Sequence, residues 1–303
     1  MTEDARRALG RVGLWTFALE GRPAGWVRDA AAEIEDLGYG AIWFGESFGR
    51  DTFGQAWLLL TATSRVVVAS GIANIAVRDP IAMATAERTL GEAFPGRYLL
   101  GLGGHRVDDT PMRLDGYTMP VVGRAVASMT DYLDRMDAVP VHSVPPATPP
   151  RRVLAALGPR MLDLAGRRTW GAHPYFVPVR HTAQAREIMG PDAFLGVEQA
   201  VVLDTDTARA REVAREHVAG YVGLAPHQEA SMRRLGYGDA DLAGGPSDRL
   251  VDDIVAYGDA GAILERVQEH LDAGADHVCV QVLTADPAEP PLPQWRELAP
   301  VLL

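Results

Sequence analysis

The sequence predicts an α/β fold of the (β/α)8 TIM-barrel class, with a helical insertion after the seventh strand. The chain has 303 residues, it contains eight strand-like apolar segments, and helical patterns separate these segments almost throughout. Strict alternation of strands and helices is typical of parallel sheets, and a chain of this length accommodates one closed eight-stranded barrel. We therefore expect a single domain over residues 1–303.

The expected strands are short and mostly apolar, as in parallel strands that are buried on both faces. They are Val12–Phe17, Ala41–Glu46, Val66–Ile72, Tyr98–Gly103, Arg152–Leu157, Gly171–Val177, Gly196–Leu203 and His277–Leu283. Helix starts are marked between them. Asp79-Pro80 supplies an N-cap and a first-turn proline, and Gly158-Pro159 opens the helix after the fifth strand in a similar way.

One segment, Thr205–Tyr257, is too long for a single crossover helix. We expect it to hold two or three helices beyond the seventh strand. Its Gly244–Asp248 stretch is typical of a loop that ends in a helix cap. Insertions of this kind either cover the mouth of the barrel or elaborate its surface, and the pattern does not separate the two.

The composition excludes several classes of protein. Hydrophobic residues make up 47% of the chain, enough for a sizeable core, and the formal net charge of −11 opposes general binding to nucleic acid or to membrane surfaces. Neither a signal-peptide pattern nor an apolar stretch of about 20 residues is present, so a cytoplasmic location is expected. The single cysteine, Cys279, excludes an internal disulfide and is expected to be a buried small side chain, and no metal site is predicted.

Functional residues are expected at the C-terminal ends of the strands, where the active sites of such barrels lie. The second strand ends in Glu46 and Ser47, a carboxylate and a hydroxyl, for which a solvent-exposed pair is the alternative interpretation. The third strand leads into Gly71, Ile72 and Asn74. A glycine beside small residues permits a bulge, or the close approach of a flat ligand, at this end.

The fourth strand carries Gly101 and Gly103 on one face, because side chains alternate along a strand. Two inward positions without side chains leave room for a ring system, whereas a tight turn explains only Gly103 and Gly104. His105 then begins a polar loop, and it is a candidate proton donor because the pKa of histidine lies near neutrality.

The fifth strand continues into Ala156, Leu157, Gly158, Pro159 and Arg160. A turn of small residues that leads into a helix presents free backbone N–H groups, which suit an anion. Many turns between a strand and a helix have some of this character, so this signal is weak alone.

Two further polar side chains lie on expected strands. His173 either lines the top of the barrel or is a core histidine bonded to the backbone. Gln281 alternates with valines that should face the outer helices, so it should point inward near the mouth. A buried glutamine needs partners, which are either protein groups or a ligand.

At these strand ends the sequence resembles the bacterial luciferase-like monooxygenase superfamily, and within it the oxidoreductases that use the deazaflavin coenzyme F420. The matching stretches are Gly13–Phe17, Ala32–Trp43, Gly71–Asn74, Pro95–Gly103, Ala155–Met161 and His270–Val278. They cover nearly the whole chain in the expected order.

The resemblance implies a barrel in which the flavin-like ring lies across the end of the third strand, beside a bulge with a cis peptide at Gly71-Ile72. It places the ribityl phosphate at Ala156–Arg160. The family's F420-dependent dehydrogenases carry a catalytic histidine, tryptophan and glutamate at positions that correspond here to Ser47, Asp51 and Arg106, or its neighbour His105. None of these matches, so those catalytic roles are not transferred.

The leading hypothesis is hydride transfer between F420 and a small organic substrate, with His105, Glu46 and Ser47, in that order, as candidate proton-transfer residues. The expected cofactor-binding residues are Gly71, Ile72, Asn74, Gly103, Gly104, Ala156, Leu157, Gly158, Pro159 and Arg160. The alternatives are an FMN-dependent monooxygenase, which oxygen consumption would reveal, and a catalytically quiet flavin-binding barrel. The expected partner is a small molecule rather than nucleic acid or membrane, and a homodimer is an open alternative to a monomer.

Overall fold

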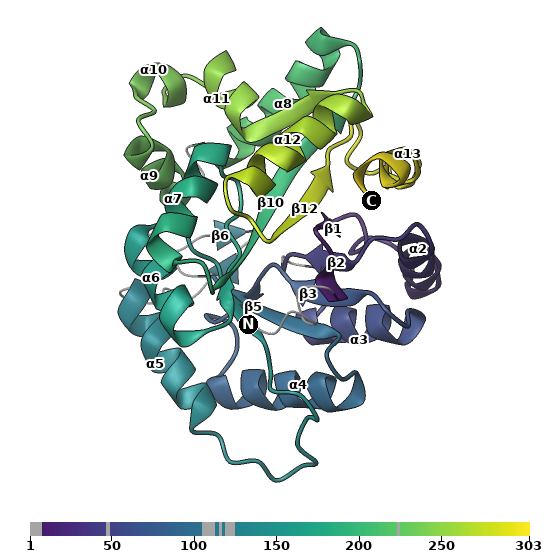
Figure 1. Cartoon of the computed structure of the whole chain (residues 1–303), viewed down its shortest axis with the longest axis vertical. Helices are drawn as coiled ribbons and strands as arrows, with labels where there is room; N and C mark the ends of the chain where they lie inside the picture. Colours follow the sequence, from purple (N-terminus) through teal and green to yellow (C-terminus); the bar gives the residue numbers. More distant parts are fainter. Residues whose placement is uncertain (1–7, 47–48, 105–112, 115–116, 119–124, 223–224) are drawn as a thin grey trace.

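The fold is a closed barrel of eight parallel strands, as predicted (Figure 1). The computed structural model of the protein describes residues 8–46, 49–104, 113–114, 117–118, 125–222 and 225–303. The barrel strands are β1 (Val12–Trp15), β2 (Ala41–Phe44), β3 (Val67–Ser70), β5 (Tyr98–Gly103), β8 (Arg152–Leu154), β9 (Gly171–Ala172), β10 (Phe194–Leu203) and β12 (His277–Val282). They pair in this order, and the pairing of β12 with β1 closes the ring.

Helices surround the barrel between successive strands. They are α2 (Ala24–Asp36), α3 (Thr52–Ala62), α4 (Pro80–Ala93), α5 (Ala125–Asp137), α6 (Pro159–Arg168), α7 (Val179–Met189), α12 (Ala260–Asp272) and α13 (Leu292–Leu302). The predicted start of α4 is confirmed, because the Asp79 carboxylate accepts the backbone N–H of Ile81 at 2.8 Å. Gly158 and Pro159 likewise begin α6.

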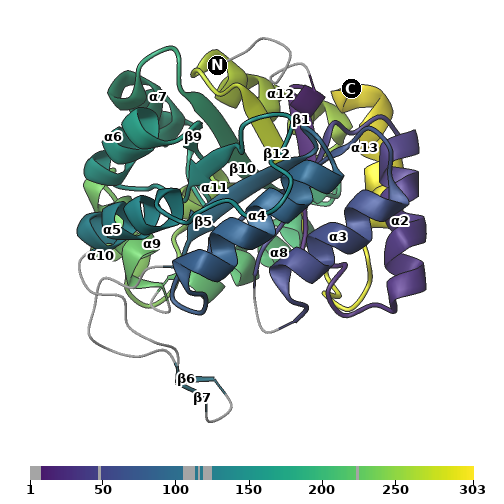
Figure 2. The same ribbon diagram turned by 90° about the horizontal axis from the view of Figure 1, so that it is seen from below.

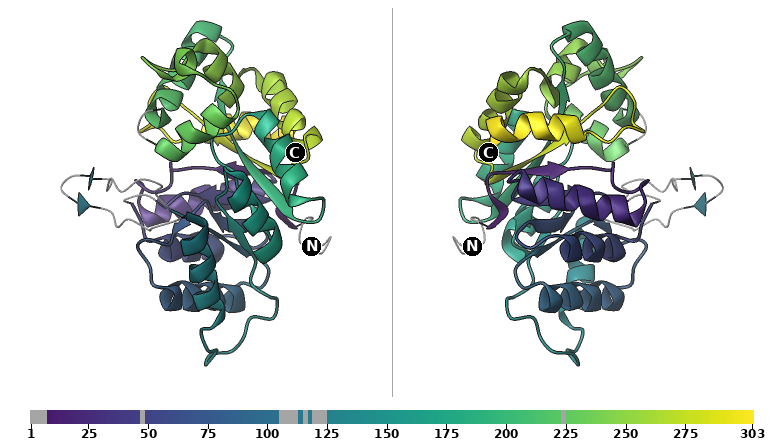
Figure 3. Two further views of the ribbon diagram at one scale, coloured as in Figure 1. Left: turned by 90° about the vertical axis from the view of Figure 1, so that its left-hand side faces the viewer. Right: turned by 90° about the vertical axis from the view of Figure 1, so that its right-hand side faces the viewer.

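The expected insertion follows β10 and contains α8 (Thr207–Tyr221), α9 (Pro226–Arg234), α10 (Asp239–Leu242) and α11 (Asp248–Ile254). It lies at one end of the molecule, and α4 lies at the other (Figure 3). The insertion ends in a strand that was not predicted, β11 (Val255–Gly258), which pairs with β10. β9 pairs with β10 only at Phe194 and Leu195, so the later part of this β10 edge is free to accept β11.

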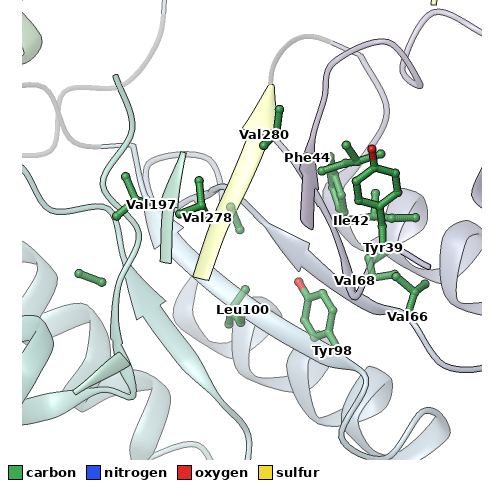
Figure 4. Close-up of a cluster of buried hydrophobic side chains, with 14 of the residues drawn as sticks. Tyr39, Ile42, Phe44, Val66, Val68, Tyr98, Leu100, Val197, Val278 and Val280 are labelled. Carbon is green, nitrogen blue, oxygen red and sulfur yellow. The ribbon is translucent and has the colours of Figure 1, made fainter. Parts of the chain in front are cut away.

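The core has an inner and an outer layer. The valines of β12 point outward into the main cluster beneath the helices, together with Ile42, Val68 and Leu100 (Figure 4). Cys279 faces inward with large aromatic side chains and is fully buried, as expected for a small apolar side chain. The alternation predicted for the last strand is therefore correct.

The sixth barrel strand is shorter than the predicted Gly171–Val177, because β9 stops at Ala172. Pro174 has no N–H group for a sheet, and Phe176 has a positive φ of 60° that leaves the strand conformation. Beyond β5, the two-residue strands β6 (Arg113–Leu114) and β7 (Tyr117–Thr118) form an antiparallel hairpin that stands away from the barrel in Figure 2.

Candidate active site

The third strand is interrupted at the predicted place. β3 ends at Ser70, the peptide between Gly71 and Ile72 is cis, and the chain pairs with β5 again as β4 (Ala73–Asn74). The Ser70 hydroxyl donates to the carbonyl of Gly101 at 3.0 Å and accepts the N–H of Gly101 at 2.9 Å. This side chain bridges the two strands where the regular ladder stops, and the predicted bulge is confirmed.

The inward-facing glycines of β5 make room for this bulge and not for a ring. A Cβ atom on Gly101 would lie 2.0 Å from the carbonyl oxygen of Ser70, and one on Gly103 would lie 2.8 Å from Cγ1 of Ile72. A Cβ atom on Gly104 would lie 2.0 Å from Oδ1 of Asn74, so the Asn74 side chain occupies the space beside Gly104. The prediction of open space next to Gly101 and Gly103 is therefore wrong, because the bulged strand folds into that space.

Glu46 holds this bulge in place. Its Oε2 atom accepts the backbone N–H of Asn74 at 2.6 Å and Nη1 of Arg78 at 2.6 Å. Nη2 of Arg78 lies 2.5 Å from Oε1, and the Glu46 side chain is only 9% exposed. Both carboxylate oxygens are thus engaged. The other two candidate proton-transfer residues, Ser47 and His105, lie outside the described residues.

The turn at the start of α6 has the features of an anion site. No side chain caps the helix at Gly158, and the N–H groups of Leu157, Gly158 and Arg160 have no acceptor among the described residues, whereas Met161 already donates to the Gly158 carbonyl at 3.1 Å. The Leu157 carbonyl accepts Nε2 of His181 at 3.0 Å and Nη2 of Arg234 at 3.4 Å. Arg234 belongs to the insertion helix α9, which sequence reasoning did not connect with this turn. Neither Arg160 nor Arg234 has a carboxylate partner among the described residues.

The His181 ring is neutral and adds no positive charge to this turn. Burial lowers the pKa of His181, and the nearby Arg234 lowers it further. The neutral ring must carry its proton on Nε2 to donate to the Leu157 carbonyl. His181 therefore fixes the orientation of the turn, and the cations available to an anion are the arginines.

Aromatic side chains pack together next to the C-terminal end of β1. The Trp15 ring packs edge-on against Phe17 at 4.5 Å between centroids and against Tyr175 at 5.0 Å. The Tyr175 hydroxyl donates to Oε1 of Gln281 at 2.9 Å and lies 2.8 Å from the hydroxyl of Tyr221, a residue of α8. Gln281 thus points inward near the mouth, as predicted, with a protein group as its partner.

His173 is a core histidine bonded to the backbone, which is one of the two predicted alternatives. Its Nδ1 lies 2.9 Å from the carbonyl of Gly196, and its ring stacks on Trp43 at 4.3 Å. Burial lowers the pKa of His173 to about 4, so the ring is neutral. Within the described part of the chain, its Nε2 and the Nε1 of Trp15 have no hydrogen-bond partner, and both lie within 3 Å of where a Cβ atom on Gly71 would be.

Sequence reasoning missed Glu198, an inward-facing residue of β10. Its Oε2 accepts the backbone N–H of Phe176 at 2.9 Å, and its Oε1 has no partner in the residues that the structure describes. Burial raises the pKa of Glu198 to about 8. The carboxyl group is therefore mostly protonated at neutral pH. A signal was available, because a charged residue in the middle of an apolar strand is rare without a specific role.

The geometry offers neither a metal site nor a membrane-spanning helix among the described residues. The described part of the chain contains no group of three or more His, Cys, Asp or Glu residues that could hold a metal ion. Within the same residues, no helix is both long enough and apolar enough to cross a membrane.

Solved structures share this architecture. The chain superposes on an F420-dependent secondary alcohol dehydrogenase, in complex with an F420–acetone adduct, with a TM-score of 0.72 and 17% identity over 97% of this chain and 99% of that one. It also superposes on the FMN-bound oxygenating constituent of 3,6-diketocamphane monooxygenase from Pseudomonas putida, with a TM-score of 0.63 and 17% identity over 95% and 96% of the two chains. At these identities the likeness shows the fold.

A sequence relative comes from Mycobacterium tuberculosis (strain ATCC 25618 / H37Rv) and is named, provisionally, as a coenzyme F420-dependent oxidoreductase. It is 25% identical over 332 aligned residues, which cover 89% of this chain and 92% of the relative. The model of the luciferase-like monooxygenase family matches residues 11–277. That match spans most of the barrel, from the first strand to the start of the last, and this protein therefore belongs to the luciferase-like monooxygenase family.

Proposed function

We propose that this protein is an oxidoreductase that transfers a hydride between coenzyme F420 and a small organic substrate. The observation that carries the proposal is the turn at Gly158, where unpartnered backbone N–H groups lie beside Arg234, a guanidinium that has no carboxylate partner among the described residues. The relative and the neighbour whose names include F420 support the same cofactor. A bound deazaflavin supplies the hydride chemistry, and the protein supplies binding, orientation and protons.

The residues at the mouth fit such a cofactor in two places. The amides of Leu157, Gly158 and Arg160 would bind the phosphate, assisted by the guanidinium groups of Arg160 and Arg234, and the missing side chain of Gly158 leaves space for it. Ala156 and Pro159 complete this turn. The bulge at Gly71 and Ile72, with Asn74, would support the ring, while Gly103 and Gly104 permit the bulge.

The two arginines also favour F420 over FMN. The phosphate of F420 is a diester that continues into an acidic side chain, whereas FMN ends at a phosphate monoester. The additional negative charge of F420 therefore lies beyond the phosphate, where a guanidinium group at the edge of the turn would pair with it. A guanidinium group that has no carboxylate partner gains more from an added anion than one that is already paired.

For the proton transfer we propose His105 first, followed by Glu46 and Ser47. The contacts of Glu46 support a positioning role for it, because two hydrogen bonds, from Asn74 and Arg78, and a further ion-pair contact with Arg78 hold its oxygens. Any direct part of Glu46 in proton transfer would require Arg78 to move.

The test is a side-by-side titration of the cofactor-free protein with F420 and with FMN, followed by fluorescence. We expect tighter binding of F420. If FMN binds tenfold more tightly, a difference of about 1.4 kcal/mol, the deazaflavin proposal fails. The second candidate, an FMN-dependent monooxygenase, is favoured by the FMN-bound neighbour and predicts oxygen consumption during turnover. Cofactor binding without turnover of any screened substrate would favour a catalytically quiet barrel.

We also propose that the protein pairs with a second copy through α3. This helix contains no charged residue, its Trp57 is 45% exposed, and a surface hollow of about 510 Å³ adjoins it. The hollow is lined by Arg28, Arg50 and Asp51 as well as by Trp57 and Leu58, so it offers the apolar centre and charged edge that an interface between two copies requires. Trp57→Lys is expected to convert a dimer into a monomer in sedimentation experiments. A wild-type protein that sediments as a monomer at micromolar concentration contradicts this assembly.

A further inference from the structure

The Gln281 side chain has a fixed orientation at the mouth of the barrel. It lies at the C-terminal end of β12, faces inward and is 8% exposed. Its Oε1 atom accepts the hydroxyl of Tyr175 at 2.9 Å. The amide nitrogen, Nε2, has no acceptor among the described residues and keeps contact with solvent. Two N–H donors are therefore available at the mouth.

Packing holds this amide in place from two sides. The Tyr175 ring packs on Trp15 at 5.0 Å, and its hydroxyl lies 2.8 Å from that of Tyr221. The Tyr221 ring in turn stacks on Phe176 at 4.7 Å. The barrel and the insertion helix α8 thus fix the glutamine together, and donors that are held in this way bind an acceptor at a smaller entropic cost.

Two buried ionisable groups in this part of the barrel carry no charge at neutral pH. Glu198, which accepts the backbone N–H of Phe176, is mostly protonated because burial raises its pKa to about 8. Cys279, opposite Glu198 on β12, is also protonated, because burial raises the pKa of its thiol. Aromatic rings lie beside these groups, because Tyr175 packs on Trp15 and Trp15 packs on Phe17, which is 40% exposed. Such a surface favours an apolar, uncharged molecule.

We infer that Gln281 is a substrate-binding residue whose amide N–H groups hold the oxygen of a neutral carbonyl compound, with the apolar body of that compound against Phe17 and Tyr175. A carbonyl oxygen only accepts hydrogen bonds, so it complements a site that offers only donors. This inference rests on the proposed function for the reaction, and it deepens that function by naming the class of substrate.

The test compares two probes, acetophenone and ethylbenzene, which differ by the carbonyl oxygen. Their affinities are measured by tryptophan fluorescence in the wild-type protein and in Gln281→Met, which keeps the side-chain length and removes the donors. Comparison of the acetophenone-to-ethylbenzene affinity ratio between the two proteins cancels the difference in hydrophobicity between the probes. We expect the ratio to fall about fivefold in the variant, the usual worth of one neutral hydrogen bond.

Infrared spectroscopy of bound acetophenone gives a second readout, because a hydrogen bond lowers the carbonyl stretching frequency. The shift should be lost in Gln281→Met and reduced in Tyr175→Phe, which removes the hydroxyl that orients the amide. The control is Tyr39→Phe, since the hydroxyl of Tyr39 bonds to the carbonyl of Trp295, away from the mouth. This variant should behave as wild type.

An unchanged affinity ratio and an unchanged carbonyl frequency in Gln281→Met would overturn the inference. Tighter binding of benzoate, an anion, than of acetophenone would overturn the assignment of a neutral substrate. These outcomes are independent of the titration with F420 and FMN, which tests the proposed cofactor. If F420 binds while the Gln281 variant has no effect, the proposed function stands and the substrate assignment fails.

Discussion

A substitution at Gly158 should change cofactor affinity and stability in opposite directions. Gly158 has φ −101° and ψ 155°, a conformation that any residue adopts. A Cβ atom there would have Nη2 of Arg234 as its nearest neighbour, at 3.6 Å. Gly158→Asp therefore fits without strain and places a carboxylate where the phosphate of the cofactor should lie.

The size of both effects follows from this geometry. The new carboxylate would cap α6, which has no side-chain cap, and would pair with Arg234. The cap adds a few tenths of a kcal/mol over glycine, and an exposed ion pair adds about 0.2–1 kcal/mol. A gain of roughly 1 kcal/mol raises the Tm of a chain of this size by about 2 °C. Each lost charge-assisted bond to phosphate costs about 1.5–3 kcal/mol, so affinity should fall roughly 100-fold.

The assay pairs thermal unfolding of the ligand-free protein with titrations of FMN and of riboflavin, which lacks the phosphate. FMN binding should weaken strongly, as should F420 binding, while riboflavin binding changes little. Gly158→Asn is the matched control, because it can cap the helix without a charge and should retain more of the affinity. If Gly158→Asp binds FMN and F420 as tightly as wild type, the anion site lies elsewhere. A fall in Tm would refute the unstrained geometry.

Three further predictions concern other parts of the chain. Burial alone would raise the pKa of Glu35, but hydrogen bonds from residues 64–66 outweigh it and lower the pKa from 4.5 to about 2. Glu35→Gln should thus lose about 1–2 kcal/mol of stability at pH 7, once screening by solvent is allowed for, and the difference from wild type should shrink as the pH falls from 4.5 to 2 in urea titrations. Gly71→Ala should destabilise the protein by about 1–3 kcal/mol in chemical denaturation, because the new Cβ would lie 2.7 Å from Nε1 of Trp15 and 2.9 Å from Nε2 of His173. An unchanged denaturation midpoint would contradict this packing. His105→Ala should lower turnover more than cofactor affinity, and normal turnover would leave His105 without a chemical role.

Local signals in the sequence were enough for most of the barrel. Alternation along the last strand placed Gln281 inward, and the Asp79-Pro80 pair located the start of α4. The resemblance located the bulge at Gly71-Ile72. These features depend on a few neighbouring residues, whose spacing and backbone preferences are written directly in the chain.

The contacts at the mouth were decided by the tertiary structure, because they join residues that are far apart in the chain. Arg78 reaches Glu46 from 32 positions away, and Arg234 reaches Leu157 from 77 positions away. The filling of the space beside Gly103 depends on how Ile72 folds across the neighbouring strand. The sequence by itself determined the barrel and the strand ends at which a site must lie. Only the tertiary structure decided which side chains are paired there and which remain free to bind, because pairing depends on distances that residue spacing does not encode.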